Sequence, residues 1–198
     1  MKRMSYGPGW SAIDDEWFRL YAGREPIIFR GPVEPAESPD PCKQVAAWQA
    51  DAYWHLVGYG LTELFEKVSP LSTQDGWGYE ITLRIPRSRD EAGPPIWAVQ
   101  LVESLTRYVE TTKRSLEEGD WLEFEEGFVP ETNLIAAVFA RDPAFPEAIE
   151  GPFGRFFFRQ AIGMNAAEVR VRQEIGTKAL VDVFTKRDPL LCTRPGRA

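Results

Sequence analysis

Few side chains in this sequence are suited to acid–base or nucleophilic chemistry. His55 is the only histidine, and imidazole titrates near neutral pH, so His55 is a candidate general base. No nucleophile lies near it in the sequence, and the alternative is a structural histidine hydrogen-bonded across a sheet. Glu80 stands on the polar side of an alternating segment, where its carboxylate needs water or a partner. An ion pair with Arg84 or Arg107 is the alternative for Glu80.

The remaining acidic clusters consist of residues that are adjacent in the sequence. Adjacent side chains are splayed apart in a helix and point to opposite faces in a strand. We therefore interpret these acids as solvated surface instead of the paired carboxylates of a glycosidase. They lie at Asp14–Glu16, Glu117–Glu118 and Glu125–Glu126. No phosphate-binding loop, dinucleotide fingerprint or Gly-x-Ser-x-Gly sequence is present, so we expect no cofactor and no catalytic residue of these kinds.

Residue types that bind transition metals are scarce. Besides His55 there are two cysteines, Cys42 and Cys192, which lie far apart in the sequence, and no Cys-x-x-Cys pair occurs. A zinc site of the usual kind needs more ligands of this type, so we expect that no metal is held by side chains. The two cysteines could form a disulfide, but we favour two isolated thiols in a reducing compartment.

Length and charge limit the possible classes of protein. The chain has 198 residues, enough for one sizeable core, and we expect a single domain over residues 9–190 with loose termini at 1–8 and 191–198. A net charge of -7 argues against nucleic-acid binding and permits a basic partner. No apolar run has the length of a membrane span, and the first residues lack the apolar core of a signal peptide. We therefore expect a cytoplasmic protein that does not bind membranes.

Two strand-like segments, 53–64 and 75–85, dominate the structural pattern. In the second segment, Trp77, Tyr79, Ile81, Leu83 and Ile85 alternate with small or polar residues. A period of two predicts a strand with one apolar and one polar face, which we place at the centre of a sheet. Residues 44–51 have a strand-like composition and precede the first segment as its hairpin partner.

Helical and strand segments alternate along the rest of the chain. Apolar residues at helical spacing predict helices over residues 10–21 and 96–115, the second beginning just after Pro95. Further strands are expected at 26–30, 121–124, 134–140 and 155–163, and short helices at 165–172 and 178–184. This order predicts an α+β fold with a mixed, largely antiparallel sheet packed with helices.

A series of short motifs between residues 9 and 190 resembles the Suppressor of fused family. In order, they are Trp54-His55, Gly60-Leu61-x-x-Leu64, Gly76-Trp77-Gly78-Tyr79-Glu80-Ile81-Thr82, Pro94-Pro95-x-Trp97, Gly119-Asp120, and Pro152-Phe153-Gly154 followed by Gln160, Ile162 and Gly163. The resemblance implies the fold of that family's N-terminal lobe and a non-catalytic, protein-binding role. Stand-alone bacterial relatives are proposed to be immunity proteins, which implies a cognate toxin, such as a basic toxin domain, as the partner.

The resemblance also implies a binding site. Eukaryotic members clamp a short transcription-factor peptide between two lobes by added strand pairing, and Phe65 and Asp75 match two residues that take part. This chain has Phe where the family has Tyr, has a slightly shorter connection, and ends where the second lobe would begin. The segment 64–75 is itself apolar and broken by Pro70, as expected of a sheet edge that accepts a strand.

We therefore expect another protein or an extended peptide to bind along this segment. The predicted contact residues are Phe65, Val68, Leu71, Asp75 and Glu80. The alternative is a small-ligand-binding protein or an enzyme, with an aromatic-lined pocket around His55 and Glu80.

Overall fold

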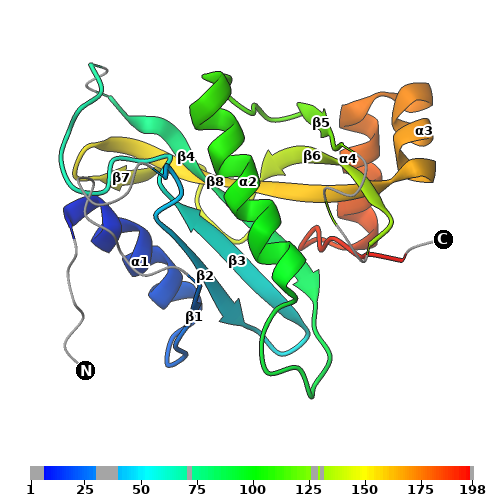
Figure 1. The fold of residues 1–198 in the computed structure, drawn as a ribbon, viewed down its shortest axis with the longest axis horizontal. Coiled ribbons are helices and arrows are strands. Elements are labelled where there is room, and N and C mark those ends of the chain that lie inside the picture. The colour runs from blue at the N-terminus through cyan, green and yellow to red at the C-terminus, as the bar shows by residue number, and fades with distance from the viewer. Residues whose placement is uncertain (1–6, 30–39, 71–72, 126–128, 130–131, 197–198) are drawn as a thin grey trace.

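The computed structural model describes residues 7–29, 40–70, 73–125, 129 and 132–196. Its helices are α1 (Pro8–Leu20), α2 (Ile96–Thr112), α3 (Ala166–Ile175) and α4 (Thr177–Arg187). Its strands are β1 (Ile27–Ile28), β2 (Gln44–Gln49), β3 (Tyr53–Tyr59), β4 (Gln74–Pro86), β5 (Trp121–Glu123), β6 (Leu134–Arg141), β7 (Ile149–Gly151) and β8 (Gly154–Asn165). The strands form one sheet in the order β1-β2-β3-β4-β8-β6-β5, and β7 pairs with β8 (Figure 1).

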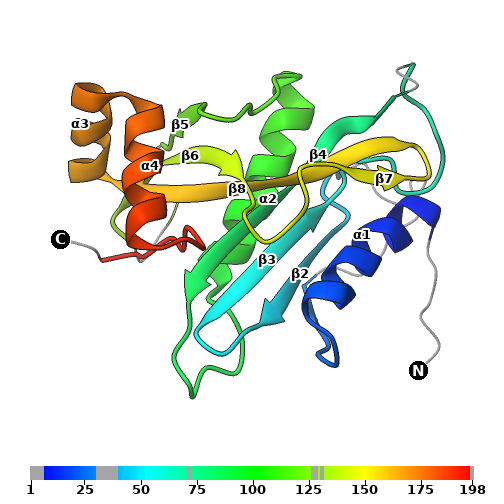
Figure 2. The ribbon, with the colours of Figure 1, turned by 180° about the vertical axis from the view of Figure 1, so that it is seen from behind.

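Helices cover both faces of this sheet. Helix α2 crosses one face, whereas α1 and the α3–α4 pair lie on the other (Figures 1 and 2). The α2 face holds an apolar core built on Leu83, Leu101 and Leu105. The opposite face is covered near β2 and β3 by an aromatic cluster around Trp17 of α1, and near β6 by a smaller cluster around Phe184 of α4.

The predicted fold class is confirmed. Among the strand pairs of the described residues, β4 and β8 are parallel and the others are antiparallel, so the sheet is mixed and largely antiparallel. The parallel pair follows from connectivity, because the chain leaves β4 through α2 and forms β5, β6 and β7 before it returns as β8.

Strand β4 lies at the centre of the sheet, as its alternating pattern predicts. Its polar face does not meet solvent, however, because Glu80, Thr82 and Arg84 are all fully buried. The alternation identifies the two faces of the strand, but it does not show that α1 and residues 190–193 cover the polar face.

The long helix α2 packs as its stripe of apolar residues predicts. Trp97, Leu101 and Leu105 are buried against the sheet, and Pro95 occupies the N-cap position. Helix α3 begins at Asn165, whose side chain accepts the backbone N–H of Glu168 while the Glu168 side chain accepts that of Asn165. This reciprocal cap fixes the start of the helix at the expected residue.

The C-terminal segment 191–198 is not loose over its first residues, contrary to expectation. Leu191, Cys192 and Thr193 are buried, and the Thr193 N–H donates to the carbonyl oxygen of Arg84 at 2.8 Å. Cys42 and Cys192 are both buried, and no disulfide joins them. At the other end, residues 7 and 8 already belong to the start of α1, and residues 1–6 lie outside the described part of the chain.

Candidate functional site

His55 lies at the centre of a buried hydrogen-bond network. It stands opposite Arg84 in the β3–β4 register and is fully buried. Its Nδ1 atom lies 2.8 Å from the hydroxyl of Tyr21, and its Nε2 atom lies 2.9 Å from a carboxylate oxygen of Asp142. The Trp17 ring packs against the imidazole with 4.3 Å between ring centroids. These contacts leave the imidazole no access to solvent.

The charges around His55 set its protonation. Burial opposes ionisation of Asp142, but its contacts with His55 and Arg84 hold its pKa well below the usual value. An ionised carboxylate only accepts hydrogen bonds, so Nε2 of His55 carries the proton and Nδ1 accepts the Tyr21 hydroxyl. Burial and the nearby Arg84 charge lower the pKa of His55 to about 4. A neutral, fully enclosed imidazole of this kind supports the fold and is not placed to act as a general base.

Arg84 links this network to the C-terminal segment. Its Nη2 atom lies 2.6 Å from Asp142 Oδ1, and its Nη1 atom donates to Gln160 and to the carbonyl oxygen of Leu190. Gln160 also donates to the carbonyls of Leu190 and Leu191. The network therefore joins β3, β4, β8, the segment after β6 and the chain end across one face of the sheet.

Glu80 is a buried anchor for the segment that follows β3. Its carboxylate accepts the backbone N–H groups of Gly60, Leu61 and Thr62 at 2.9–3.2 Å and the Thr62 hydroxyl at 2.7 Å. Neither Arg84 nor Arg107 is its partner, since these pair with Asp142 and Asp40. Burial raises the pKa of Glu80 to about 7, against hydrogen bonds that favour the charged form.

Two further acids fix the connection between β3 and β4. The buried Asp75 accepts the backbone N–H of Glu63 at 2.7 Å, and burial raises the pKa of Asp75 to about 6. Glu63 in turn accepts the N–H groups of Val68 and Ser69 and lies 3.1 Å from the amine of Lys67. The segment 60–69 therefore belongs to no helix or strand, and hydrogen bonds to carboxylates fix its backbone instead.

Helix α1 supports the same segment from the other side. The N–H of Gly9 donates to the carbonyl oxygen of Leu64 at 3.1 Å, and a Cβ atom at Gly9 would lie 1.9 Å from the carbonyl oxygen of Glu63. This position needs glycine because any side chain would collide with backbone. The Phe65 ring lies 6.0 Å from that of Trp10, between ring centroids, so Phe65 is partly packed into the core.

The five predicted contact residues thus have different surroundings. Val68 is the most exposed of the four that the structure describes, with 78% of its surface accessible, and Phe65 is half-buried. Leu71 lies outside the described residues. We expected Asp75 and Glu80 to present charge to a partner. Both are instead buried and accept hydrogen bonds from their own chain, so the prediction of a direct contact with a partner is wrong for these two residues. Binding of a partner along this segment stays a prediction.

The pocket that we expected around His55 and Glu80 does not match this geometry. His55 is bonded to Asp142 at one end of the polar face, while Glu80 is bonded to residues 60–62 at the other. Both side chains are fully buried. The two groups therefore share no accessible space in which a substrate could meet them.

Sequence comparison places the chain in a family. The family model described as "Suppressor of fused protein (SUFU)" matches residues 39–198. The chain belongs to the Suppressor of fused family. Among curated proteins it is similar to the Suppressor of fused homologs of Homo sapiens and Mus musculus, with 24% identity over 137 residues in each case. These alignments cover 67% of the chain but only 28% of each homolog's length.

Solved structures share the fold of this chain. A chain in the Sufu–Fu complex superposes with a TM-score of 0.83 at 20% identity, covering 96% of this chain and 91% of that one. Drosophila Suppressor of Fused gives a TM-score of 0.84 at 20% identity, over 97% of this chain and 51% of the fly protein. A putative SUFU homolog from Neisseria gonorrhoeae gives 0.64 at 10% identity, with 96% and 95% covered.

The described residues contain no group of three or more His, Cys, Asp or Glu side chains able to hold a metal ion. In the same part of the chain, no helix combines the length and apolar character that crossing a membrane requires.

Sequence reasoning missed two residues of the site. Asp142 directly follows the buried apolar strand β6, and an acid at that place was the available signal for a buried ionic partner. Glu63 gave no such signal, because its role depends on a local turn that brings the N–H groups of Val68 and Ser69 to its carboxylate.

Proposed function

We propose that this protein is a non-catalytic protein-binding module whose partner docks on the segment from Phe65 to Asp75. The observation that carries the proposal is the contrast within this segment. Val68 is 78% exposed, whereas the backbone on either side is fixed by the carboxylates of Glu63, Asp75 and Glu80. An exposed apolar residue on a backbone that is already ordered loses little entropy when a partner binds.

The aromatic residue beside Val68 favours the same site. Phe65 is half-buried against Trp10, so its ring is held in place while part of it stays accessible to a partner. Rigid aromatic anchors of this kind contribute much of the binding energy in protein interfaces. In this proposal Asp75 and Glu80 act as positioning residues that hold the segment and do not touch the partner.

The more specific proposal is that the module acts in the cytoplasm as an immunity protein and neutralises a cognate toxin. A net charge of -7 is complementary to a basic toxin domain and would speed their association. The structure of a Sufu–Fu complex supports protein binding as the general role, because a chain in it shares this fold.

The test uses the purified product of the neighbouring gene as the candidate partner. Its affinity is measured by calorimetry for the wild type, for Val68→Asp, and for Ile96→Asp as the matched control. Ile96 is also an exposed aliphatic residue, at 59%, but it lies at the start of α2. We expect binding that Val68→Asp weakens at least tenfold and Ile96→Asp leaves unchanged. An equal loss of affinity in both variants, or an affinity that Val68→Asp does not change, would contradict the proposed site.

A growth assay addresses the immunity role separately. Co-expression of this chain should rescue cells that produce the neighbouring gene product, and Val68→Asp should abolish the rescue. A product that binds this chain but is harmless to cells would contradict the immunity role and leave the binding module intact.

A further inference from the structure

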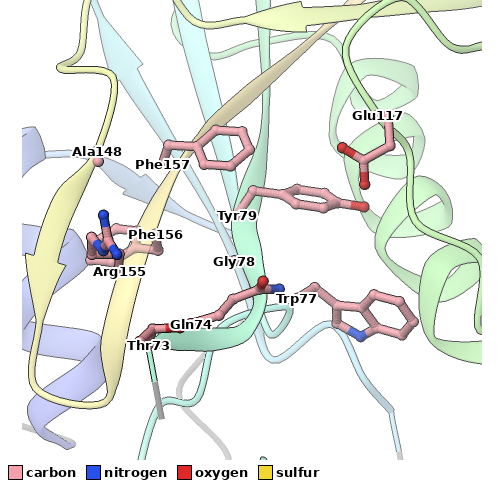
Figure 3. Close-up of a pocket in the computed structure, with 10 residues that line it drawn as sticks. All are labelled: Thr73, Gln74, Trp77, Gly78, Tyr79, Glu117, Ala148, Arg155, Phe156 and Phe157. Atoms are coloured by element: carbon pink, nitrogen blue, oxygen red, sulfur yellow. The ribbon is translucent and has the colours of Figure 1, made fainter. Parts of the chain in front are cut away.

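Strands β4 and β8 separate near their beginnings. Gln74 pairs with Arg155, and the next pair is Tyr79 with Phe157, so residues 75–78 of β4 lie opposite the single residue Phe156. The bulge depends on Gly76 and Gly78, which adopt φ values of 54° and 81°. A groove of about 310 Å³ opens beside this bulge (Figure 3).

Aromatic rings form one side of the groove. Figure 3 shows the rings of Phe157, Tyr79 and Trp77 following one another, with Glu117 and Arg155 on opposite sides of the view. The ring centroids of Tyr79 and Phe157 lie 5.8 Å apart, and the Tyr79 hydroxyl accepts the backbone N–H of Leu116 at 2.9 Å. These contacts fix the Tyr79 and Phe157 rings of the aromatic wall.

A buried arginine lies behind this wall. The guanidinium of Arg159 is 4.7 Å from the Phe157 ring centroid and 5.4 Å from that of Tyr79, and its side chain is only 3% exposed. Its one ionic contact among the described residues is a long one, with 3.4 Å between Nη2 and a carboxylate oxygen of Glu117. Its Nε and Nη1 atoms have no hydrogen-bond partner in the described part of the chain.

This arrangement leaves a buried cation poorly satisfied. Unpaired donors on a buried guanidinium carry a desolvation cost that a stronger acceptor would relieve. Glu117 is a weak partner for Arg159 because its side chain is 66% exposed, their hydrogen bond is long, and its other oxygen accepts the Ser115 hydroxyl. Arg159 is therefore available to an anion that reaches the wall and displaces the Glu117 carboxylate.

The surroundings add positive charge in an otherwise acidic protein. The Arg141 guanidinium lies 5.1 Å from the Phe157 ring centroid, and Arg155 lines the groove with its side chain 58% exposed. Within the described part of the chain, the one ion pair of Arg155 is a 3.8 Å contact with the solvent-exposed Glu150. Two arginines thus contact the Phe157 ring and a third lines the groove, in a chain whose net charge is -7.

We propose that this groove binds a small molecule in which an oxyanion, carboxylate or phosphate, is attached to a flat ring. The oxyanion replaces Glu117 as the partner of Arg159, with Arg155 at the entrance, and the ring lies against Phe157 and Trp77. Arginine binds both oxyanions through paired N–H groups, and a flat ring stacks favourably on an aromatic wall. This ligand site goes beyond the protein-binding role proposed above, although the groove shares Thr73 and Gln74 with the segment from Phe65 to Asp75.

The first experiment compares small probes by NMR, following the indole N–H signal of Trp77, which is assigned with a Trp77→Phe variant. Phenyl phosphate and benzoate should shift this signal saturably, inorganic phosphate should bind at least several-fold more weakly, and benzylamine should not bind. The tighter of the two aromatic anions identifies the natural oxyanion as phosphate or carboxylate. Equal binding of benzylamine, or no saturable shift with either anion, would overturn the proposal.

The second experiment uses two variants with opposite expected effects. Arg159→Leu should weaken phenyl phosphate or benzoate binding at least tenfold, whereas Glu117→Gln should strengthen it several-fold by removing the competing carboxylate. Arg89→Gln, an exposed change in the loop between β4 and α2, is the control and should have no effect. Because Glu117 is exposed, its variant decides the question even if Arg159→Leu fails to fold. If Glu117→Gln binds the aromatic anions no more tightly than the wild type, the idea that the ligand displaces the Glu117 carboxylate from Arg159 is refuted.

Discussion

Replacing Asp142 with Asn tests the buried network around His55 most severely. Asp142 accepts four hydrogen bonds, from Arg84 at 2.6 Å and the Ala144 N–H at 3.0 Å on one oxygen, and from Thr82 at 2.7 Å and His55 at 2.9 Å on the other. An amide NH₂ group in place of Oδ1 would face two groups that can only donate, and in place of Oδ2 it would require the Thr82 hydroxyl and the His55 ring to become acceptors.

The size of the effect follows from this geometry. Both side chains of the Arg84–Asp142 pair are fully buried, so the substitution leaves an uncompensated charge in the interior. Breaking a buried pair by removing one partner costs roughly 3–5 kcal/mol, which lowers the melting temperature of a domain of this size by about 10 °C. Urea denaturation followed by circular dichroism measures the free energy of unfolding of both proteins.

Two further variants make the test specific. Asp182→Asn is the matched control, because Asp182 pairs with Lys178 on the surface of α4 and its loss should cost less than about 1 kcal/mol. Adding Arg84→Met to Asp142→Asn removes the stranded charge, so the double variant should be more stable than the sum of the single effects predicts. An Asp142→Asn protein within about 1 kcal/mol of the wild type would refute a structural role for this network.

Three other substitutions give separate tests, each measured as the free energy of unfolding in urea. Leu105→Ala removes a buried side chain from α2 and should cost about 2–5 kcal/mol; an unchanged midpoint would contradict the assigned helix face. Burial lowers the pKa of His55 to about 4, so the unfolded state binds the extra proton, and the contribution of His55 to stability should fall by about 3 kcal/mol, relative to His55→Gln, as pH falls from 6.5 to 4. The free energy of unfolding is therefore measured against pH for the wild type and His55→Gln. A difference between the two proteins that stays constant with pH would contradict the lowered pKa. Burial raises the pKa of Glu80 from 4.5 to about 7, so the folded state binds the extra proton and stability falls as pH rises through that range. The stability of Glu80→Gln relative to the wild type should therefore rise by about 3 kcal/mol between pH 4.5 and 7. A stability difference that does not change with pH would refute the raised pKa of Glu80.

Much of the fold could be predicted because its signals are local. The alternation in β4, the apolar stripe of α2 and the Asn165 cap each depend on residues close in sequence. The burial of the polar face of β4 could not be predicted in this way. It depends on α1 and on residues 190–193, which reach Arg84 and Gln160 from the far end of the chain.

The candidate site shows the same division between local and long-range signals. The irregular, apolar segment around Val68 was visible from Pro70 and its neighbours, and Val68 is exposed. Glu80 was expected to face a partner because a carboxylate in a strand needs water or a partner, and Asp75 because it matches a residue of the family's peptide-binding site. Their true acceptor role depends on backbone N–H groups of residues 60–63, whose position a sequence pattern does not encode.

Selection from a displayed library of extended peptides tests the protein-binding claim most directly. The library is panned on the wild-type protein, and the affinity of each enriched peptide is then measured for the wild type, Val68→Asp and Ile96→Asp. The account predicts peptides whose affinity falls at least tenfold with Val68→Asp and does not change with Ile96→Asp. Failure to enrich any peptide, or peptides that bind the wild type and Val68→Asp equally well, would contradict a partner site on the segment from Phe65 to Asp75.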